Sequence, residues 1–341
     1  MDLRLTPEED QLLGAVTSLL ERHSTPERVR RAEATGFDAG LWASLQSLGV
    51  PSMALQDLDT APASLFQLVL VAEAAGACLA SAPVLEGIVA ARLLARCGPA
   101  ANKLLDSMRT AAFTATVSLQ TAPARTPRLV PAGAVARLVV GLDGDNLVAV
   151  EAEPPASRVE NLGDLSLAYR DLASGTRTIV SSGAEAVELF GAACSDWKTL
   201  GAAQLVGVGA SALGLGVEYV KSRQVFGAPI ATFQTIAHQL ADDATAIDGA
   251  RLLAYKAAWA RDENRADAEK LASMAWCFAS ESALNVTRNS LHYHGGYGFT
   301  QEYDIQLYFR RAKAYSLVWG DLRREYHRLA DLVLSKEDSR I

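Results

Sequence analysis

Residues 223–234 read RQVFGAPIATFQ, and residues 292–300 read HYHGGYGFT. Each stretch interrupts a long helix-forming region with glycine or proline, so each predicts a turn between helices. The first turn presents Arg223, whose guanidinium is suited to bidentate phosphate binding. The second turn contains Gly295 and Gly296, where backbone N–H groups can approach a ligand without a Cβ in the way. Alone, each turn has a simpler interpretation: a helix hairpin with a surface arginine, or a glycine C-cap.

Three blocks of different character surround these turns. Residues 1–110 carry apolar residues at helical spacing and predict an N-terminal helical domain. Residues 111–183 hold short β-branched runs separated by Pro and Gly, enough for a small, truncated β domain. Residues 184–341 predict a C-terminal bundle of long helices, with no Gly or Pro over 266–294. We therefore expect a mostly α protein with three domains.

Local patterns predict individual elements within these blocks. Asp143-Gly144 marks a hairpin turn, because this pair tolerates the positive φ that such turns need. Gly207, Ala210 and Gly214 lie on one side of a long helix, where small residues let another helix approach closely. Helices are expected to open at 37–42 and to cover 64–77 and 86–97, and strands to cover 112–119, 136–141, 146–150 and 176–180.

Composition narrows the class of protein. Lys and Arg total 32 against 39 Asp and Glu, and this net charge of −7 argues against a nucleic-acid binder. Charges interrupt the longest apolar stretches, and the N-terminus carries no signal-peptide pattern, so we expect no membrane span. The 4 cysteines form no C-x-x-C pair and the 5 histidines no ligating pattern, so we expect no metal site. The expected location is the cytoplasm.

Together and in this order, the two turns resemble the acyl-CoA dehydrogenase family. The pattern is R-x-x-F-G-x-P-I-x-x-F-Q, a long helical stretch, then H-G-G-Y-G-F-T-x-E-Y-D followed by L-Y-F-R-R-A-K-A. The resemblance covers nearly the whole chain and is strongest over 200–320, and the family's α, β, α plan agrees with the three blocks. The G-F-T-x-E-Y-D form resembles a bacterial subgroup, some members of which act on acyl-CoA esters of steroid side chains.

The resemblance implies an FAD cofactor and an acyl-CoA substrate. In the family, the arginine turn reaches FAD that is bound mainly by a neighbouring subunit, and the double glycine lies near the FAD pyrophosphate or adenosine. His292 stands where the family usually has glutamine, and it can still donate a hydrogen bond. The cofactor-binding residues implied in this way are Arg223, Phe226, Gln234, His292, Gly295 and Gly296.

The resemblance also implies a carboxylate that removes the α-proton of the acyl-CoA while the β-hydride passes to the flavin. The family places this base at one of two positions, and here both hold tryptophan, Trp319 and Trp197. The acids next to them are Asp321 and Asp196, which are weak candidates for a displaced base. Their simpler interpretation is a helix cap or a solvated acid, so the catalytic residue stays unassigned.

The β block departs from the family as well. Between Thr116 and Ala132 nothing matches the T-E-P-x-A-G-S-D-like loop that holds the flavin ring in the family. Three interpretations follow: a subunit that completes the FAD site of a partner, a self-sufficient dehydrogenase with a displaced Asp base, or a non-catalytic structural subunit. We favour the first, in a homo- or hetero-oligomer with an acyl-CoA dehydrogenase paralogue that passes electrons to a separate acceptor.

Overall fold

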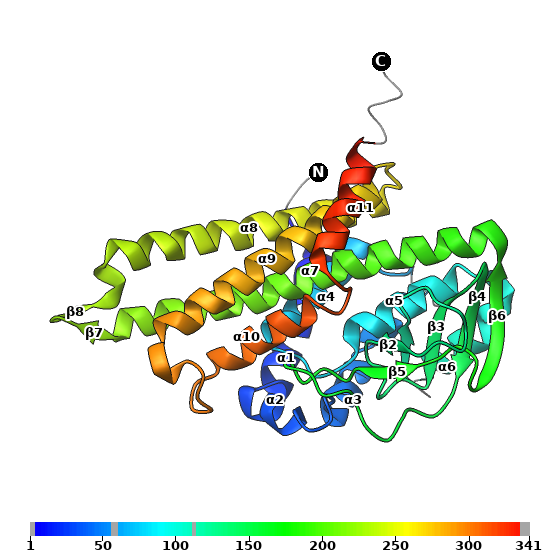
Figure 1. Cartoon of the computed structure of the whole chain (residues 1–341), viewed down its shortest axis with the longest axis horizontal. Helices are drawn as coiled ribbons and strands as arrows, with labels where there is room; N and C mark the ends of the chain where they lie inside the picture. Colours follow the sequence, from blue (N-terminus) through cyan, green and yellow to red (C-terminus); the bar gives the residue numbers. More distant parts are fainter. Residues whose placement is uncertain (1–3, 56–60, 111–113, 335–341) are drawn as a thin grey trace, which may run out of the picture. The chain divides into compact units, whose positions relative to one another are not determined.

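The computed structural model describes residues 4–55, 61–110 and 114–334 (Figure 1). Helices dominate, so the predicted mostly α fold class is confirmed. The chain divides into two compact units, whereas the division into domains 1–110, 111–183 and 184–341 stays a prediction. The mixed unit is Pro7–Leu68 with Ser81–Trp197, and the helical unit is Met1–Thr6 with Val69–Ala80 and Lys198–Ile341.

The mixed unit begins with short helices. Asp38 caps α3, because its carboxylate accepts a hydrogen bond from the backbone N–H of Leu41 (2.9 Å). The helices predicted at 37–42, 64–77 and 86–97 correspond to α3, α4 and α5, whereas α2 and α6 are too short for a periodic pattern to predict. The helical elements are α1 (Pro7–His23), α2 (Pro26–Ala32), α3 (Ala39–Ser47), η1 (Val50–Ser52), α5 (Val84–Ala95), η2 (Gly98–Ala101) and α6 (Asn102–Arg109). Helix α4 (Leu65–Ala77) begins in the mixed unit, and from Val69 onward it belongs to the helical unit.

The strands of the mixed unit form two small sheets. One has the order β1-β3-β4-β6, with β1 parallel to β3 and the other neighbours antiparallel, and the other pairs β2 with β5. The predicted Asp143-Gly144 turn joins β3 to β4, with Gly144 at φ +63°. The first strand was expected over 112–119, and residues 112–113 lie outside the described residues. The strands are β1 (Ala115–Val117), β2 (Arg128–Val130), β3 (Leu138–Asp143), β4 (Asn146–Glu151), β5 (Ala168–Arg170) and β6 (Thr176–Ser182).

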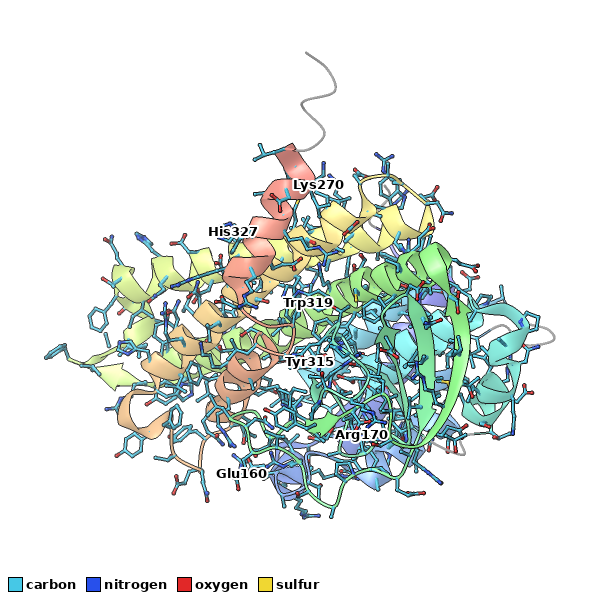
Figure 2. All side chains as sticks on the ribbon, turned by 45° about the vertical axis from the view of Figure 1, so that its right-hand side comes forward. Glu160, Arg170, Lys270, Tyr315, Trp319 and His327 are labelled. Carbon is cyan, nitrogen blue, oxygen red and sulfur yellow. The ribbon has the colours of Figure 1, made fainter. Side chains whose placement is uncertain are left out.

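Two buried arginines face each other across the smaller sheet. Arg128 of β2 is the register partner of Arg170 of β5, which Figure 2 labels. Buried guanidinium groups need partners for their N–H donors, and here backbone carbonyls supply them. Arg128 donates to the carbonyls of Gln120, Ala122 and Leu142, and Arg170 to those of Gly133, Ala136 and Ala152. These bonds fasten the loops of the mixed unit to its sheets.

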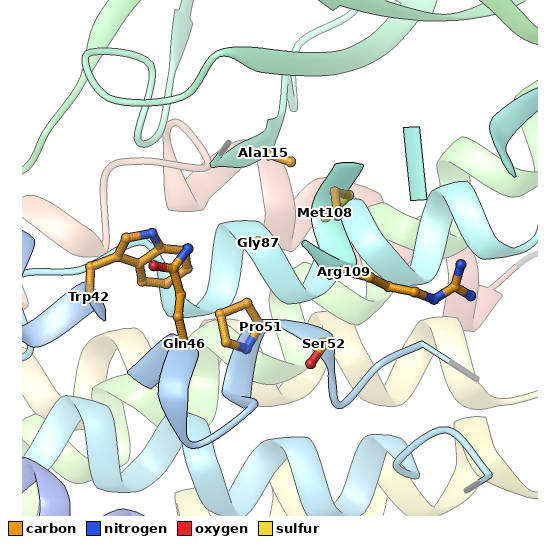
Figure 3. A pocket seen from close by; sticks show the side chains of 8 residues that line it. All are labelled: Trp42, Gln46, Pro51, Ser52, Gly87, Met108, Arg109 and Ala115. Carbon is orange, nitrogen blue, oxygen red and sulfur yellow. The ribbon is translucent and has the colours of Figure 1, made fainter. Parts of the chain in front are cut away.

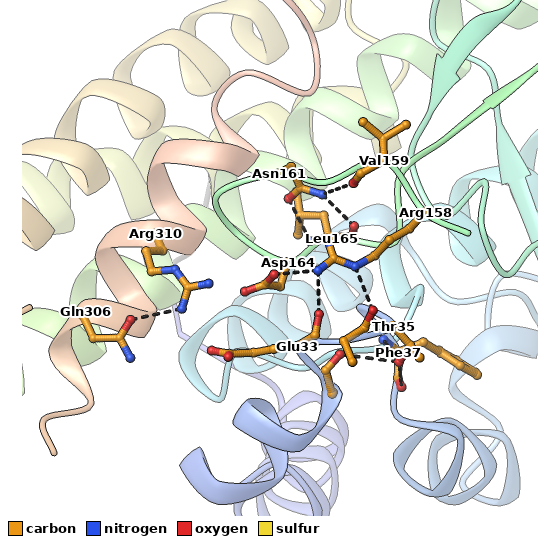
Figure 4. A network of polar contacts seen from close by, with 12 residues as sticks. Glu33, Thr35, Phe37, Arg158, Val159, Asn161, Asp164, Leu165, Gln306 and Arg310 are labelled. Atoms are coloured by element: carbon orange, nitrogen blue, oxygen red, sulfur yellow. Dashed lines mark hydrogen bonds and ion pairs between the residues drawn. The ribbon is translucent and has the colours of Figure 1, made fainter. Parts of the chain in front are cut away.

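The long loop between β4 and β5 is fastened to the N-terminal helices by Arg158 (Figure 4). Its guanidinium donates to the carbonyl oxygen of Glu33 (2.6 Å) and to the carboxylate of Asp164 (2.7 Å). Gly36 packs against the same loop so closely that a Cβ there would lie 2.6 Å from the carbonyl oxygen of Asp164. The loop is therefore held in place from two sides.

A small cavity of about 30 Å³ lies in the mixed unit (Figure 3). This volume accommodates one or two water molecules, whereas pockets for small organic ligands hold about 300–1,000 Å³. The cavity is therefore no candidate ligand site. Its lining residues are Trp42, Gln46, Pro51, Ser52, Gly87, Met108, Arg109 and Ala115.

The helical unit is built from long helices (Figure 1). Helix α7 is long and apolar enough to cross a membrane, but 61% of its most apolar stretch is buried inside the protein, as in the core helix of a soluble protein. The elements are α7 (Gly183–Ser222), which begins in the mixed unit, β7 (Gln224–Val225), β8 (Ala228–Pro229), η3 (Ile230–Thr232), α8 (Gln234–Asp262), α9 (Ala268–Tyr293), η4 (Gly295–Tyr297), α10 (Ile305–Tyr315) and α11 (Leu322–Leu334).

Helices α4 and α7 cross with their backbones in contact. A Cβ at Gly76 would lie 1.9 Å from the carbonyl oxygen of Gln204, and one at Gly207 would lie 2.0 Å from that of Glu73. Only residues without a Cβ fit at such distances. The close approach predicted from Gly207 is thus confirmed, whereas a Cβ at Gly214 would meet no atom within 4 Å.

We expect Gly207→Ala to lower the free energy of unfolding by more than about 3 kcal/mol, because the new methyl group overlaps a backbone oxygen that cannot move independently. Gly214→Ala on the same helix is the matched control. It should raise the free energy of unfolding by up to about 1 kcal/mol, since alanine favours helix over glycine. Urea unfolding followed by circular dichroism measures both, and equal effects of the two substitutions would contradict the close crossing.

Candidate functional site

The first turn of interest is a tight hairpin at the end of helix α7. The two-residue strands β7 and β8 are joined by Phe226 and Gly227, which have φ of +54° and +81°. Two consecutive residues at positive φ define the turn type that suits a two-residue hairpin, and a phenylalanine there is strained. The Phe226 side chain is 95% exposed. The fold therefore holds an aromatic ring in water on a strained backbone.

Hydrogen bonds fix the backbone on both sides of the hairpin. The N–H of Arg223 donates to the carbonyl of Tyr219 (2.9 Å), and the carbonyl of Arg223 accepts from the N–H of Ile230 (2.8 Å). The Arg223 side chain is exposed. Residues 230–232 form the single 3₁₀ turn η3, and α8 begins at Gln234. The extended backbone of Phe233 (ψ 123°) separates the two.

The second turn ends helix α9. The helix stops at Tyr293, and Gly295 adopts φ +60° in the 3₁₀ turn η4. Gly295 therefore has the conformation of a glycine C-cap. A Cβ at Gly295 or Gly296 would meet no atom within 4 Å, so packing does not explain either glycine. Gly298 differs, because a Cβ there would lie 2.5 Å from the carbonyl oxygen of Leu291.

Aromatic stacking and a small apolar cluster bring the two turns to the same end of the helical unit (Figure 1). The ring of Tyr219 on α7 stacks on that of His294 with 4.0 Å between centroids. Val220, Ile230 and Tyr293 form a buried cluster directly below. We call the surface formed by the two turns the bundle-end site. It comprises Arg223, Phe226, Gln234, His292, Gly295 and Gly296, which are all exposed.

The bundle-end site has groups that fit FAD. The exposed guanidinium of Arg223 can donate two parallel hydrogen bonds to a phosphate. The open backbone at Gly295 and Gly296 leaves room for a pyrophosphate to approach N–H groups. The exposed ring of Phe226 offers a surface for an aromatic ring system. The roles of these residues toward FAD stay predictions.

The two acids weighed as a displaced base have different environments. Asp321 is exposed and its carboxylate accepts a hydrogen bond from the backbone N–H of Arg323 (2.9 Å), so it caps helix α11 as the simpler interpretation predicts. For Asp196 that interpretation is wrong. Asp196 lies within helix α7, is 1% exposed, and pairs with the Nε of Arg92 (3.0 Å). Since Arg92 is distant in sequence, no local pattern predicts this ion pair.

Trp319, which Figure 2 labels, stands at one of the two base positions. It belongs to a buried polar cluster that the sequence patterns did not reveal. Its indole N–H donates to the carboxylate of Glu325 (2.8 Å), which also accepts a hydrogen bond from the Lys198 ammonium. Lys198 is fully buried, lies over the Trp319 ring at 4.6 Å from its centroid, and donates to Ser273 (3.0 Å). The position of Trp319 is thus occupied by a cluster whose charged and polar groups already have hydrogen-bond partners.

The carboxylate of Glu325 is ionised at neutral pH. Burial raises the pKa of Glu325, but the Lys198 charge and the hydrogen bonds from Lys198, Ser273 and Trp319 outweigh it, so the pKa lies below its usual range. A general base at neutral pH works best with a pKa near 7 and a free lone pair facing substrate. Glu325 has neither property, so we assign it a structural role.

The other tryptophan at a base position, Trp197, is fully buried. It lies well inside helix α7. An indole has no proton-accepting group at neutral pH. In the described part of the chain, no group of three or more His, Cys, Asp or Glu is arranged to hold a metal ion.

Comparisons with known proteins agree with this fold. Residues 196–329 match the family model for the acyl-CoA dehydrogenase C-terminal domain. The acyl-CoA dehydrogenase IpdE2 of Mycobacterium tuberculosis is 30% identical over 90% of this chain and 91% of that protein. The steroid ACAD structure Tcur3481-Tcur3483 is 28% identical, with a TM-score of 0.86 over 97% of this chain and 99% of that chain. The ChsE4-ChsE5 complex from Mycobacterium tuberculosis is 25% identical, with a TM-score of 0.81 over 98% and 99%.

This chain belongs to the acyl-CoA dehydrogenase family. The protein is an oxidoreductase of the acyl-CoA dehydrogenase type, and its cofactor is FAD, as the sequence resemblance implies.

The Lys198–Glu325 ion pair gives a stability prediction. Lys198→Met leaves the Glu325 carboxylate buried without its counter-ion, so we expect a loss of about 3–5 kcal/mol in the free energy of unfolding at pH 7. The double variant Lys198→Met/Glu325→Leu removes both charges and should lose clearly less than Lys198→Met alone. Urea unfolding measures the free energy of unfolding of the double variant and of the single variants Lys198→Met and Glu325→Leu. If the loss in the double variant equals the sum of the two single losses, the coupling is contradicted.

The same pair has a pH signature. The Glu325 pKa is lower in the folded than in the unfolded state, so its contribution is complete above the unfolded pKa of about 4.3 and is lost as the pH falls through the folded value. The stability difference between wild type and Glu325→Gln should therefore be constant from pH 7 to pH 6 and shrink below about pH 4.3. A difference that grows on acidification would contradict this assignment.

Proposed function

We propose that this chain is a subunit of a heteromeric FAD-dependent acyl-CoA dehydrogenase, in which it completes the FAD site of a partner subunit. The observation that carries the proposal is a contrast within one chain. The bundle-end site presents its arginine, aromatic ring and open glycine backbone to solvent. Both base positions, in contrast, hold tryptophan, and one of them is closed by a buried ion pair.

The exposed position of the bundle-end site supports a role toward a neighbouring subunit. Every side chain of the site projects from an end of the helical unit, and Phe226 is 95% exposed on a strained backbone. Strain of this kind costs about 1–3 kcal/mol and persists where the surrounding structure or function requires it. A ligand or partner that covers this end would bury the ring and use the arginine.

The chain's own residues would act on the partner's cofactor by binding and orientation. FAD, when bound, supplies the acceptor for the β-hydride of the acyl-CoA. Arg223 would donate to a phosphate, and the N–H groups near Gly295 and Gly296 would accommodate the pyrophosphate. No residue at the two base positions of this chain can accept the α-proton, so the partner would supply the catalytic carboxylate.

The names of two similar solved structures support a pairwise assembly. Both the steroid ACAD Tcur3481-Tcur3483 and the ChsE4-ChsE5 complex are named for two components. Together with the subgroup resemblance of residues 298–304, GFTQEYD, these names support a steroid-derived acyl-CoA as the substrate class. Oligomerisation with an acyl-CoA dehydrogenase paralogue in the cytoplasm, and transfer of electrons to a separate acceptor, belong to the same proposal.

Replacing Arg223 by Ala in the co-expressed assembly should weaken FAD binding by about tenfold to a hundredfold, the worth of a charge-assisted hydrogen bond of about 1.5–3 kcal/mol. Lys221→Ala is the matched control, because it removes an equal charge two residues away from Arg223. Lys221 is exposed and pairs with Glu218. Titration of the flavin-free assembly with FAD measures both affinities. Unchanged affinity in Arg223→Ala would contradict the role of the bundle-end site.

The chain purified without a partner should show little acyl-CoA oxidation with an artificial electron acceptor, because it lacks a base at either family position. Activity should appear on co-expression with a paralogue and should persist in Asp321→Asn, since Asp321 only caps a helix. Robust turnover by the chain alone, abolished by Asp321→Asn, would instead establish a self-sufficient enzyme with a displaced base.

A further inference from the structure

Helices α8 and α9 are joined behind the bundle-end site by a buried carboxylate. Asp243 of α8 is 6% exposed, and both of its oxygens accept from the amide nitrogen of Asn289 on α9, at 3.0 and 3.2 Å. A buried ionisable group is costly unless it serves a specific contact. No role in the proposed FAD contacts accounts for it, because Asp243 is buried and does not reach the exposed surface.

A second unused polar group lies one turn further along α9. The hydroxyl of Tyr293 is buried and has no hydrogen-bond partner among the described residues. Burial and the nearby charge of Asp243 raise the pKa of Tyr293 to about 12. The pKa of Asp243 is also raised, mainly by burial and to a smaller extent by the charge of Asp242. The hydrogen bond from Asn289 and the charge of Arg288 lower this pKa but do not outweigh the burial. The Asp243 carboxylate is therefore close to both Asn289 and Tyr293 in the last two turns of α9.

The remaining contacts at this end are mostly apolar. The cluster of Val220, Ile230 and Tyr293 is extended by the partly buried side chains of Ile236 and Leu240. Apolar contacts tolerate small sliding and rotation of one helix on another, whereas a satisfied buried hydrogen bond selects one arrangement. The Asp243–Asn289 contact thus supplies the directional restraint that the apolar cluster lacks.

We infer that Asp243 is a positioning residue for the bundle-end site, because through Asn289 it fixes the last turn of α9 and with it the place of His292 and Gly295 relative to Arg223. That this positioning serves FAD binding rests on the proposed function, whereas the effect of Asp243 on the position of α9 does not. Asn289 precedes His292 by less than one helical turn, so any rotation of α9 there moves the double-glycine turn directly.

Two variants separate this role from the presence of a charge. Asp243→Ala removes the acceptor and leaves the half-buried Asn289 amide without it. Asp243→Asn keeps one side-chain oxygen as acceptor and removes the charge, so it should rescue the contact. Asp242→Ala is the matched control, because Asp242 is the neighbouring acid and is exposed.

Hydrogen exchange on the whole chain tests the geometry without FAD. In Asp243→Ala, the N–H groups of His294 and Gly298, which donate to Leu291 and Gly295, should exchange at least about tenfold faster. Asp243→Asn and Asp242→Ala should keep the protection of the wild type. Wild-type protection in Asp243→Ala would overturn the inference.

FAD titration of the co-expressed, flavin-free assembly tests the purpose. Asp243→Ala should weaken FAD binding about fivefold to tenfold, with Asp243→Asn near wild type. Ile247→Ala, a buried apolar truncation one turn further along α8, controls for general destabilisation. Equal losses in Ile247→Ala and Asp243→Ala would overturn the positioning role. If Arg223→Ala also leaves FAD affinity unchanged, the proposed function fails, while the exchange result still decides whether Asp243 positions α9.

Discussion

The stacking of Tyr219 on His294, above the buried cluster of Val220, Ile230 and Tyr293, is the contact on which the candidate site depends. The two turns are far apart in sequence and neither is a site alone. Since α7, α8 and α9 all end or begin at this cluster, burial of a few apolar side chains places an arginine, an aromatic ring and a glycine turn on one surface. Hydrophobic packing therefore assembles a surface that is itself polar.

In the proposed function, the chain separates two tasks that a complete acyl-CoA dehydrogenase combines. Its bundle end offers groups for the phosphates and rings of a cofactor, whereas its base positions are filled by indoles. At Trp319, the indole replaces the family's carboxylate without leaving an empty space. The Lys198–Glu325 ion pair lies against the indole and has its hydrogen bonds satisfied. A single substitution that introduces a carboxylate at Trp319 would place a second negative charge beside Glu325 and disturb a buried pair.

Local signals were enough to predict the turns and most long elements. The end of α7 before Arg223 follows from Gly227 and Pro229, and the hairpin at Gly144 follows from Asp-Gly. The strands β2 and β5 have three residues each, too few to show alternation. The ion pairs Arg92–Asp196 and Lys198–Glu325 join residues 104 and 127 positions apart, and a single sequence carries no pattern that links them.

The exposed ring of Phe226 bears on the free energy of assembly in the proposed function. Moving a fully exposed phenylalanine out of water is favourable by about 1.5–3 kcal/mol, so a partner that covers the Phe226 ring, as proposed above, would gain up to this amount. Under the proposed function, this gain would favour the assembled subunit over the free one.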